Sequence, residues 1–403
     1  MIPVKEAQQI ILDNVRLLPT EPVLLAAATG RVLRQEVRAD MDMPPFDRAR
    51  MDGYALRAAD TTSLPARLHI VGEVAAGSEF EGSISADQAV RIMTGAPVPE
   101  GADAVQKIEV TEADHETVLI KEAVKPGQFI TPRASEAAHG QVLIQPGHRI
   151  TPADVAVMAT FGCAEVTVSR QPLVNVLSTG SELVDVHQVP SAAQIRNSNS
   201  YATRGYLDQL GAQSHGLGIV PDDEELTFRR IGAALEQCDA LILSGGVSMG
   251  DYDLVKHVLR RLGAHILFDR VCLHPGKPTV FATFEDKAIF ALPGNPVSVA
   301  VTFLAFAFPG LNAMMGAQEK FLPTIIATLE RDTTHAPDRR SYLPGELRIR
   351  DGRALVTPLK WGGSSDLVAF RRANALIMVP EGVRVIEAGQ LCETLLIPQQ
   401  EVR

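Results

Sequence analysis

The chain has 403 residues, of which 46% are hydrophobic and 21% charged, a balance typical of a soluble protein with several domains. Its 48 acidic residues outnumber 38 basic ones, and the net charge of −10 disfavours nucleic acid as a partner. No basic N-terminal region precedes an apolar run and no stretch of about 18 apolar residues occurs, so neither a signal peptide nor a membrane span is predicted.

The first 170 residues predict two helices separated by a run of short strands. Residues 1–20 carry apolar side chains at helical spacing and predict an amphipathic helix. Residues 21–140 hold β-type runs broken by Gly and Pro, at 68–74, 89–93 and 118–120, and predict a small all-β domain. Residues 141–170 predict a strand at 141–144, a helix that begins at Thr151 and Pro152, and a strand at 164–169.

From residue 171 to 318, predicted strands alternate with predicted helices. The strands are at 173–177, 213–220, 240–243, 265–271 and 288–291, and the helices at 200–210, 222–236, 254–262 and 297–315. This alternation predicts a parallel, doubly wound α/β sheet. The longest apolar segment, residues 297–308, is too short to span a membrane and predicts a buried helix. Residues 319–403 return to short strands and predict a separate β-barrel or sandwich.

The cysteines are scattered, without the spacing of a zinc site or a disulfide framework. They are Cys163, Cys238, Cys272 and Cys392. This usage predicts a reducing, cytoplasmic environment.

Three predicted strand ends of the α/β region carry loops rich in Gly and small polar residues, at 178–182, 244–253 and 292–298. Ligands of open parallel sheets bind at this edge, where Gly lets backbone N–H groups approach a phosphate. Tight turns also use Gly, but three such loops on one edge favour a binding site. No G-x-G-x-x-G opens a helix after a strand and Gly276-Lys277-Pro278 lacks the rest of a P-loop, which disfavours a Rossmann dehydrogenase and a P-loop ATPase.

Two carboxylates, Glu182 and Asp253, lie in these loops. Carboxylates beside a polyphosphate repel it unless a cation intervenes, and Mg²⁺ is commonly held by one or two carboxylates plus phosphate. Each residue could instead cap or begin a helix.

Lys277 lies in a segment that prolines stiffen on both sides. A lysine held in this way at a strand end is a suitable point charge for an oxyanion. The alternative is a solvated lysine on a turn.

Residues 40–55 combine acids, arginines and prolines with the apolar Phe46, Met51 and Tyr54. The prolines predict a fixed conformation that could include a cis bond. The segment is either an inter-domain hinge or part of a site.

Taken together, these segments resemble the MoeA family, whose members share fold and activity with the E domains of gephyrin and of plant molybdenum-cofactor synthases. The matching motifs follow one another in the family order, at residues 44–47 with 51–55, 94–99, 178–182, 195–199, 244–253, 275–278 and 292–296. The resemblance covers nearly the whole chain.

The resemblance implies a multidomain α/β plus β protein with four domains. These are an elongated helical domain (1–20 and 141–170), a small β domain (21–140), a molybdopterin-binding α/β domain (171–318) and a C-terminal β-barrel (319–403). It implies a cytoplasmic homodimer that takes adenylylated molybdopterin, molybdate and Mg²⁺ and yields molybdenum cofactor and AMP. Contact with the upstream adenylyltransferase is a further expectation, and no contact with nucleic acid or membrane is expected.

The resemblance also assigns roles to residues. Glu182 and Asp253 would hold the cation, and the catalytic set would be Asp52, Thr94, Glu182, Asp253 and Lys277, with Asp52 and Thr94 supplied by the partner subunit. The nucleotide and phosphate site would be lined by Ser178, Thr179, Gly180, Asn197, Ser244, Gly245, Gly246, Pro293, Gly294 and Asn295. The molybdate pocket would consist of Lys277, Pro278, Ser298, Arg339 and Ser364. Cations, hydroxyls and backbone donors of this kind suit an oxyanion.

The sequence departs from the family pattern at Ala49-Arg50, at Ser135-Glu136, at Tyr342-Leu343-Pro344 and at His274, where the family commonly has Lys. These departures concern anion preference, including molybdate against tungstate, and dimer contacts. Two alternatives stay open. One is the adenylyltransferase of the preceding step, which needs neither the N-terminal nor the C-terminal domains. The other is a non-catalytic molybdopterin-binding scaffold, which would not need Glu182, Asp253 and Lys277.

Overall fold

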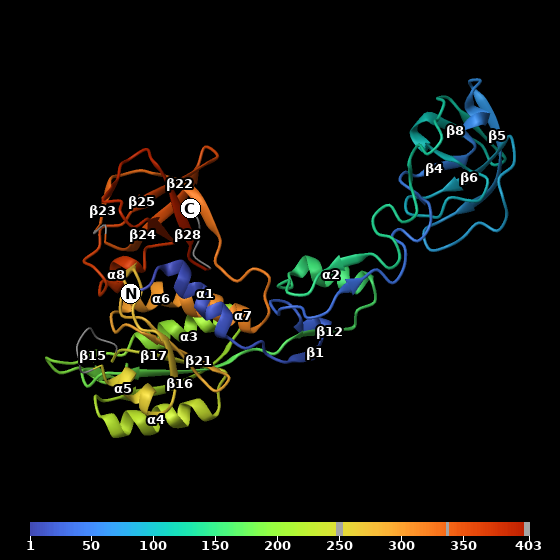
Figure 1. Cartoon of the computed structure of the whole chain (residues 1–403). Helices are drawn as coiled ribbons and strands as arrows, with labels where there is room; N and C mark the ends of the chain where they lie inside the picture. Colours follow the sequence, from blue (N-terminus) through green and yellow to red (C-terminus); the bar gives the residue numbers. More distant parts are fainter. Residues whose placement is uncertain (247–252, 336–337, 399–403) are drawn as a thin grey trace. The chain divides into compact units, whose positions relative to one another are not determined.

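The structure is a computed structural model that describes residues 1–246, 253–335 and 338–398. The chain divides into two compact units (Figure 1). The first consists of Met1–Gln35, Pro146–Val155 and Glu165–Arg403, and the second of Glu36–Gln145 and Ala156–Ala164.

The centre of the first unit is a six-stranded sheet in the order β16-β13-β17-β21-β20-β18. Four neighbouring strands are parallel: β16 (Gln213–Val220), β13 (Leu173–Thr179), β17 (Ala240–Ser244) and β21 (Lys287–Leu292). The last two are β20 (Val280–Phe284), which is antiparallel to both of its neighbours, and β18 (His265–Phe268), which therefore runs in the same direction as the four parallel strands. The predicted strand at 265–271 corresponds to β18, but β20, which lies between β18 and the parallel strands, is not predicted from the sequence. β20 is antiparallel to β21 because a tight hairpin joins them, and a two-residue connection can join only antiparallel strands.

Helices cover both faces of this sheet, as the sequence predicts (Figure 1). On one face pack α1 (Val4–Asn14), α3 (Asn199–Leu210) and α6 (Pro296–Thr302), and on the other α4 (Glu224–Glu236) and α5 (Leu254–Arg261). Alternate strand residues serve the two cores: Ile242 faces the first and Leu241 the second. The helix α4 begins where expected, with Asp223 accepting a hydrogen bond from Leu226 N as its N-cap.

The buried apolar helix runs from α6 through a π-helical segment, η4 (Phe303–Ala307), into α7 (Phe308–Met314). The whole run, Pro296–Met314, nearly coincides with the predicted helix at 297–315. It is long and apolar enough to cross a membrane, whereas the sequence analysis counted only the apolar segment at 297–308, which is too short. Its apolar stretch is 89% buried inside the protein, and it forms part of the same core as α1 and α3. The prediction that this segment is a buried core helix is confirmed.

The C-terminal part of the first unit is a five-stranded barrel. Its strands are β22 (Thr324–Leu329), β24 (Arg340–Arg350), β25 (Arg353–Pro358), β26 (Ala375–Val379) and β28 (Leu391–Leu396). The pairing of β24 with β26 closes the barrel. The short strand β19 (Leu273–His274), from the α/β region, adds to β24 in parallel. Smaller elements are α8 (Leu367–Phe370) and the pair β23 (Thr333–Thr334) and β27 (Val385–Ile386).

The remaining elements come from several parts of the first 200 residues, and one of them, α2 (Pro152–Thr160), is divided between the two units. The helix α1 is shorter than the predicted 1–20, and β1 (Thr20–Leu24) follows it and pairs with β12 (Glu165–Ser169). The residues of β1 therefore do not join the sheet of the small β domain. The helix α2 (Pro152–Thr160) begins at the predicted residue, and Thr151 and Asp154 hydrogen-bond each other across its first turn. Short elements here are η1 (Leu25–Ala27), β14 (Leu183–Val184) and β15 (Ile195–Arg196).

The second unit is built on a sheet in the order β7-β4-β6-β5-β9-β8, with apolar clusters on its two faces. Its strands are β4 (Gly53–Leu56), β5 (Ala66–Val74), β6 (Gln88–Ile92), β7 (Ala104–Lys107), β8 (Thr111–Ala113) and β9 (Thr117–Ile120). Two-stranded pairs join β2 (Val37–Arg38) to β11 (Val142–Ile144) and β3 (Arg48–Ala49) to β10 (Ile130–Thr131), and 3₁₀ turns are η2 (Ala58–Thr61) and η3 (Ile108–Val110). This agrees with the predicted all-β character of the region.

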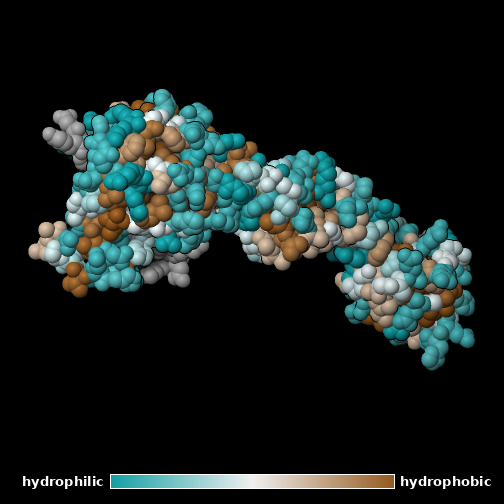
Figure 2. Space-filling model, turned by 90° about the horizontal axis from the view of Figure 1, so that it is seen from below, coloured by the Kyte–Doolittle hydropathy of each residue, from teal (hydrophilic) through white to brown (hydrophobic). Residues whose placement is uncertain are grey.

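The face of the molecule in Figure 2 shows hydrophobic residues interspersed among hydrophilic ones.

Candidate functional site

The carboxyl ends of three parallel strands lie side by side in the first unit. Ser178 at the end of β13 is in register with Ser244 of β17, and Ser244 is in register with Leu292 of β21. The loops that follow these strands therefore begin at the same edge, as the alternation of strands and helices predicts.

Buried hydroxyl and amide groups fix this edge. The Ser178 hydroxyl donates a hydrogen bond to Asn197 Oδ1 (3.1 Å) and lies 3.0 Å from Ser244 Oγ. All three residues are at most 5% exposed. The side-chain amide of Asn199, at the start of α3, donates to the Gly294 carbonyl (2.7 Å). These bonds tie the loops to one another before any ligand arrives.

Thr179, Gly245 and Gly246 form a close-packed turn at the same edge. Both glycines have positive φ, +89° and +66°. A β-carbon on Gly245 would lie 2.2 Å from the Thr179 carbonyl oxygen, and one on Gly246 would lie 2.6 Å from Val255 Cγ2. Thr179 Oγ1 is buried and has no hydrogen-bond partner among the described residues. The turn therefore needs glycine, and it leaves one hydroxyl available to a ligand.

The two predicted cation ligands differ in their surroundings. Glu182 is exposed, beside Gly180. Asp253 is 8% exposed and caps α5, accepting from Lys256 N (3.4 Å), and its Oδ2 lies 2.7 Å from Lys256 Nζ. Burial raises the pKa of Asp253, although Lys256 opposes this. Asp253 therefore caps α5, as the alternative interpretation predicts. It also lies at the strand edge where the cation is expected to bind.

The predicted loop at 244–253 is described only in part. Residues 247–252 lie outside the described residues, so the structure describes its two ends, 244–246 and Asp253.

Residues predicted for the molybdate pocket come from both the α/β region and the barrel side of the chain. Asn295 Nδ2 donates to Ser364 Oγ (2.8 Å), and Val297 N donates to the Ser364 carbonyl (3.0 Å). Ser298 is buried in the first turn of α6. The structure therefore brings Ser364 to the loop that follows β21.

The segment that carries Lys277 and Pro278 is attached to the barrel by β19, which places Leu273 opposite Arg340. Lys277 is half-buried, and among the described residues no carboxylate forms an ion pair with it. Arg339 is paired with Asp338, with 3.0 Å between Nε and the carboxylate. A half-buried lysine without a carboxylate partner is available to an anion.

His274 belongs to a short polar chain beside these residues. His335 Nδ1 lies 2.9 Å from Ser341 Oγ, which lies 3.5 Å from His274 Nδ1. Burial lowers the pKa of His274, Arg339 and His335 lower it further, and Asp338 opposes them. His274 is therefore held in its neutral form more firmly than an ordinary histidine.

Asp52 and Thr94 lie in the second unit and are exposed. Asp52 Oδ1 accepts hydrogen bonds from both the backbone N and the hydroxyl of Thr94, each 2.7 Å long. These two bonds lower the pKa of Asp52 and keep its carboxylate ionised. Asp52 and Thr94, which the resemblance places in the same catalytic set, are therefore hydrogen-bonded to each other.

Other acids of the same segment have structural partners. Asp42 accepts hydrogen bonds from His139 N (2.8 Å) and Arg133 Nε (2.7 Å), and Asp47 accepts one from Arg133 N (2.8 Å). The Met43–Pro44 bond is cis, as the prolines of this segment suggest. Hydrogen bonds on both sides hold residues 42–47 in a fixed conformation.

Sequence reasoning missed several residues that the structure brings into or beside the site: Asn199, Lys256, His335 and Ser341. Asn199 stands in a motif already singled out, and Lys256 is three residues from Asp253, a spacing that places side chains on one helix face. His335 and Ser341 carry no sequence signal, because their proximity to His274 depends on the pairing of β19 with β24.

Three family models match the chain in order. The MoeA N-terminal region (domain I and II) matches residues 2–162, a probable molybdopterin binding domain matches 175–313, and the MoeA C-terminal region (domain IV) matches 327–397. Together they span most of the chain.

Curated relatives and solved structures agree with these models. The chain is 34% identical to a molybdopterin molybdenumtransferase of Bacillus subtilis, over 99% of this chain and 95% of the relative. It is 36% identical to the enzyme of that name from a Nostoc species, over 94% and 89%. A crystal structure of the molybdopterin biosynthesis MoeA protein from Pyrococcus horikoshii superposes with a TM-score of 0.85 at 29% identity, covering 98% of this chain and 100% of that one.

Proposed function

Because the chain belongs to the MoeA family, we infer that it is a molybdopterin molybdenumtransferase, an enzyme of molybdenum-cofactor biosynthesis. We propose that its substrates are adenylylated molybdopterin and molybdate and that it releases AMP. The observation that carries this proposal is the contact between the loops that we assign to the phosphates and to the molybdate. The turn at Gly245 adjoins the Gly294 loop, where a β-carbon on Gly294 would lie 3.7 Å from Gly245 Cα, and the same loop bonds to Ser364.

Each group of residues has a chemical task in this proposal. The Thr179 hydroxyl and the backbone N–H of Gly246 receive phosphate oxygens, since a turn without β-carbons lets a ligand approach, while the N–H of Gly245 donates to the Leu292 carbonyl (3.2 Å). Lys277, with the hydroxyls of Ser298 and Ser364, holds the molybdate. Binding both anions on one strand edge raises their effective concentration toward each other and orients them for transfer.

We propose Mg²⁺ as the cation of the reaction, with Glu182 and Asp253 as its protein ligands. The described residues contain no group of three or more His, Cys, Asp or Glu side chains suited to a metal. Two carboxylates fit a cation that takes its remaining ligands from phosphate and water. When bound, such a cation would supply positive charge beside the phosphates.

We also propose that the enzyme is a cytoplasmic homodimer whose site is completed by Asp52 and Thr94 of the partner subunit. Mixing two inactive variants tests this. In a mixed dimer of Asp52→Asn and Asp253→Asn subunits, one site carries both substitutions and the other carries neither, so AMP release should return. No recovery after confirmed subunit exchange, or full activity of a monomer, would contradict the shared site.

Two alternatives remain in view. An adenylyltransferase of the preceding step does not need the regions that match at residues 2–162 and 327–397. A scaffold would bind adenylylated molybdopterin without turnover. Incubation of the protein with adenylylated molybdopterin, with and without molybdate, separates the three: only the proposed function predicts AMP release that depends on molybdate. Replacing molybdate by tungstate in the same assay measures anion preference, and co-purification with the upstream adenylyltransferase tests the proposed contact.

A further inference from the structure

Lys256 is a buried cation that contacts two carboxylates. It lies in the first turn of α5, and its side chain is 9% exposed. Its Nζ is 2.7 Å from Asp253 Oδ2 and 3.3 Å from Asp269 Oδ2. The side chain of Asp253 is 7% exposed and that of Asp269 is 39% exposed. The lysine therefore lies between an inner and an outer carboxylate.

The contact with the inner carboxylate is close but poorly directed. Asp253 Oδ2 is at ion-pair distance from the amine, yet it accepts no hydrogen bond of good geometry. By contrast, Lys256 Nζ donates a hydrogen bond to Asp269 Oδ2. The amine thus already has a directional partner that it keeps if its contact with Asp253 is lost.

The ion pair with Lys256 compensates the buried negative charge of Asp253. A carboxylate buried at the strand edge is costly without a positive partner. A divalent cation can be that partner only while it is bound with its phosphate ligands. At other times Lys256 supplies the positive charge.

We propose that Lys256 is a displaceable counter-ion, which neutralises Asp253 in the free enzyme and turns to Asp269 when a divalent cation binds. The proposal rests on the proposed role of Asp253 as a cation ligand. Lys256 is then a positioning residue. Competition from its amine keeps the affinity for free metal low, so that the cation enters together with a phosphate ligand.

Binding of Mn²⁺ in the presence of ADP, measured by calorimetry and by electron paramagnetic resonance, tests this proposal without turnover. Lys256→Met removes the competing charge and should tighten Mn²⁺ binding about tenfold or more, as expected for loss of a like charge at contact distance. Asp269→Asn deprives the amine of its second partner and should weaken Mn²⁺ binding. Lys287→Met is the matched control, because in the described part of the chain Lys287, at the start of β21, pairs only with the exposed Glu285 and Asp286.

The proposal predicts that Mn²⁺ affinity rises in Lys256→Met and falls in Asp269→Asn. A merely structural role of Lys256 does not give such opposite shifts. Unchanged or weaker Mn²⁺ binding in Lys256→Met, with Asp269→Asn like wild type, would overturn the proposal. If Lys256→Met fails to fold, the Mn²⁺ affinity of Asp269→Asn alone decides the proposal. A wild-type enzyme that binds no Mn²⁺ at Asp253 would also overturn it. Molybdate-dependent AMP release by the wild-type enzyme would still support the proposed function in any of these cases.

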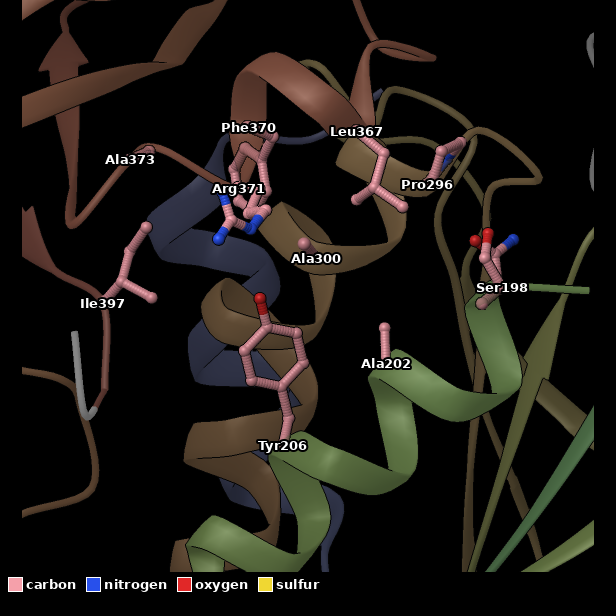
Figure 3. Close-up of a pocket in the computed structure, with 11 residues that line it drawn as sticks. Ser198, Ala202, Tyr206, Pro296, Ala300, Leu367, Phe370, Arg371, Ala373 and Ile397 are labelled. Atoms are coloured by element: carbon pink, nitrogen blue, oxygen red, sulfur yellow. The ribbon is translucent and has the colours of Figure 1, made fainter.

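The cavity in Figure 3 combines apolar walls at Ala202, Ala300, Leu367 and Phe370 with the polar groups of Ser198, Tyr206 and Arg371.

Discussion

Replacing Gly245 by alanine tests whether the strand edge depends on the shape of its turn. Gly245 has φ +89°, and an added β-carbon would lie 2.2 Å from the carbonyl oxygen of Thr179. The left-handed conformation costs a non-glycine residue about 1–2 kcal/mol, and overpacking adds about 1–3 kcal/mol, so Gly245→Ala should lose roughly 2–5 kcal/mol of stability. Because relief of the clash would move the loop, affinity for ADP should fall as well.

Gly263→Ala is the matched control. Gly263 has φ +86°, but no heavy atom lies within 4 Å of an added β-carbon. This variant should lose only the conformational contribution of about 1–2 kcal/mol and bind ADP like wild type. Unfolding experiments and calorimetric titration with ADP compare the stability and the ADP affinity of both variants. The difference between the variants measures the effect of the contact with Thr179. Equal destabilisation of the two variants, with unchanged ADP affinity, would refute the reasoning.

Three further predictions concern single residues. Burial and Arg339 lower the pKa of His274 below its ordinary value of 6.5. The stabilisation that the neutral His274 provides is therefore complete above pH 6.5 and is lost as the pH falls through the lowered pKa. His274→Gln should make the thermal midpoint less sensitive to a change from about pH 7.5 to about pH 5.5, and an unchanged sensitivity would contradict this. Asp239 accepts two hydrogen bonds from Arg170, of 2.8 and 2.6 Å, so Asp239→Asn should lower stability by about 1–3 kcal/mol in urea unfolding, and a neutral effect would show that solvent screens the pair. Lys277→Ala should raise the molybdate requirement about tenfold while barely changing that for adenylylated molybdopterin, and high molybdate should restore part of the rate; equal weakening toward both substrates would place Lys277 on the phosphate path instead.

The parallel strands and their loops could be predicted because local patterns determine them. The predicted strand at 213–220 coincides with β16, and the strands before Ser178 and Ser244 end at the predicted edge. Alternating strands and helices leave little choice for the position of the loops, since parallel strands have all their carboxyl ends at one edge of the sheet.

The parts that could not be predicted depend on contacts between distant segments. β1 pairs with β12, far away in the sequence, and its own residues resemble those of the β domain that follows. The hairpin between β20 and β21 turns at Glu285, a non-glycine residue with φ +53°, so the usual Gly signal is missing. The ion pair of Asp253 with Lys256 has a visible spacing, but its burial becomes apparent only in the folded sheet.

We propose that one strand edge joins a nucleotide phosphate site to a molybdate site for transfer of molybdenum. The most direct measurement follows AMP release and molybdenum incorporation together in single-turnover reactions of the purified enzyme with adenylylated molybdopterin, Mg²⁺ and molybdate. We expect AMP and molybdenum-containing cofactor to appear at the same rate and in equal amounts, and neither to form without molybdate. AMP release at an unchanged rate without molybdate, or molybdenum incorporation without AMP release, would contradict it.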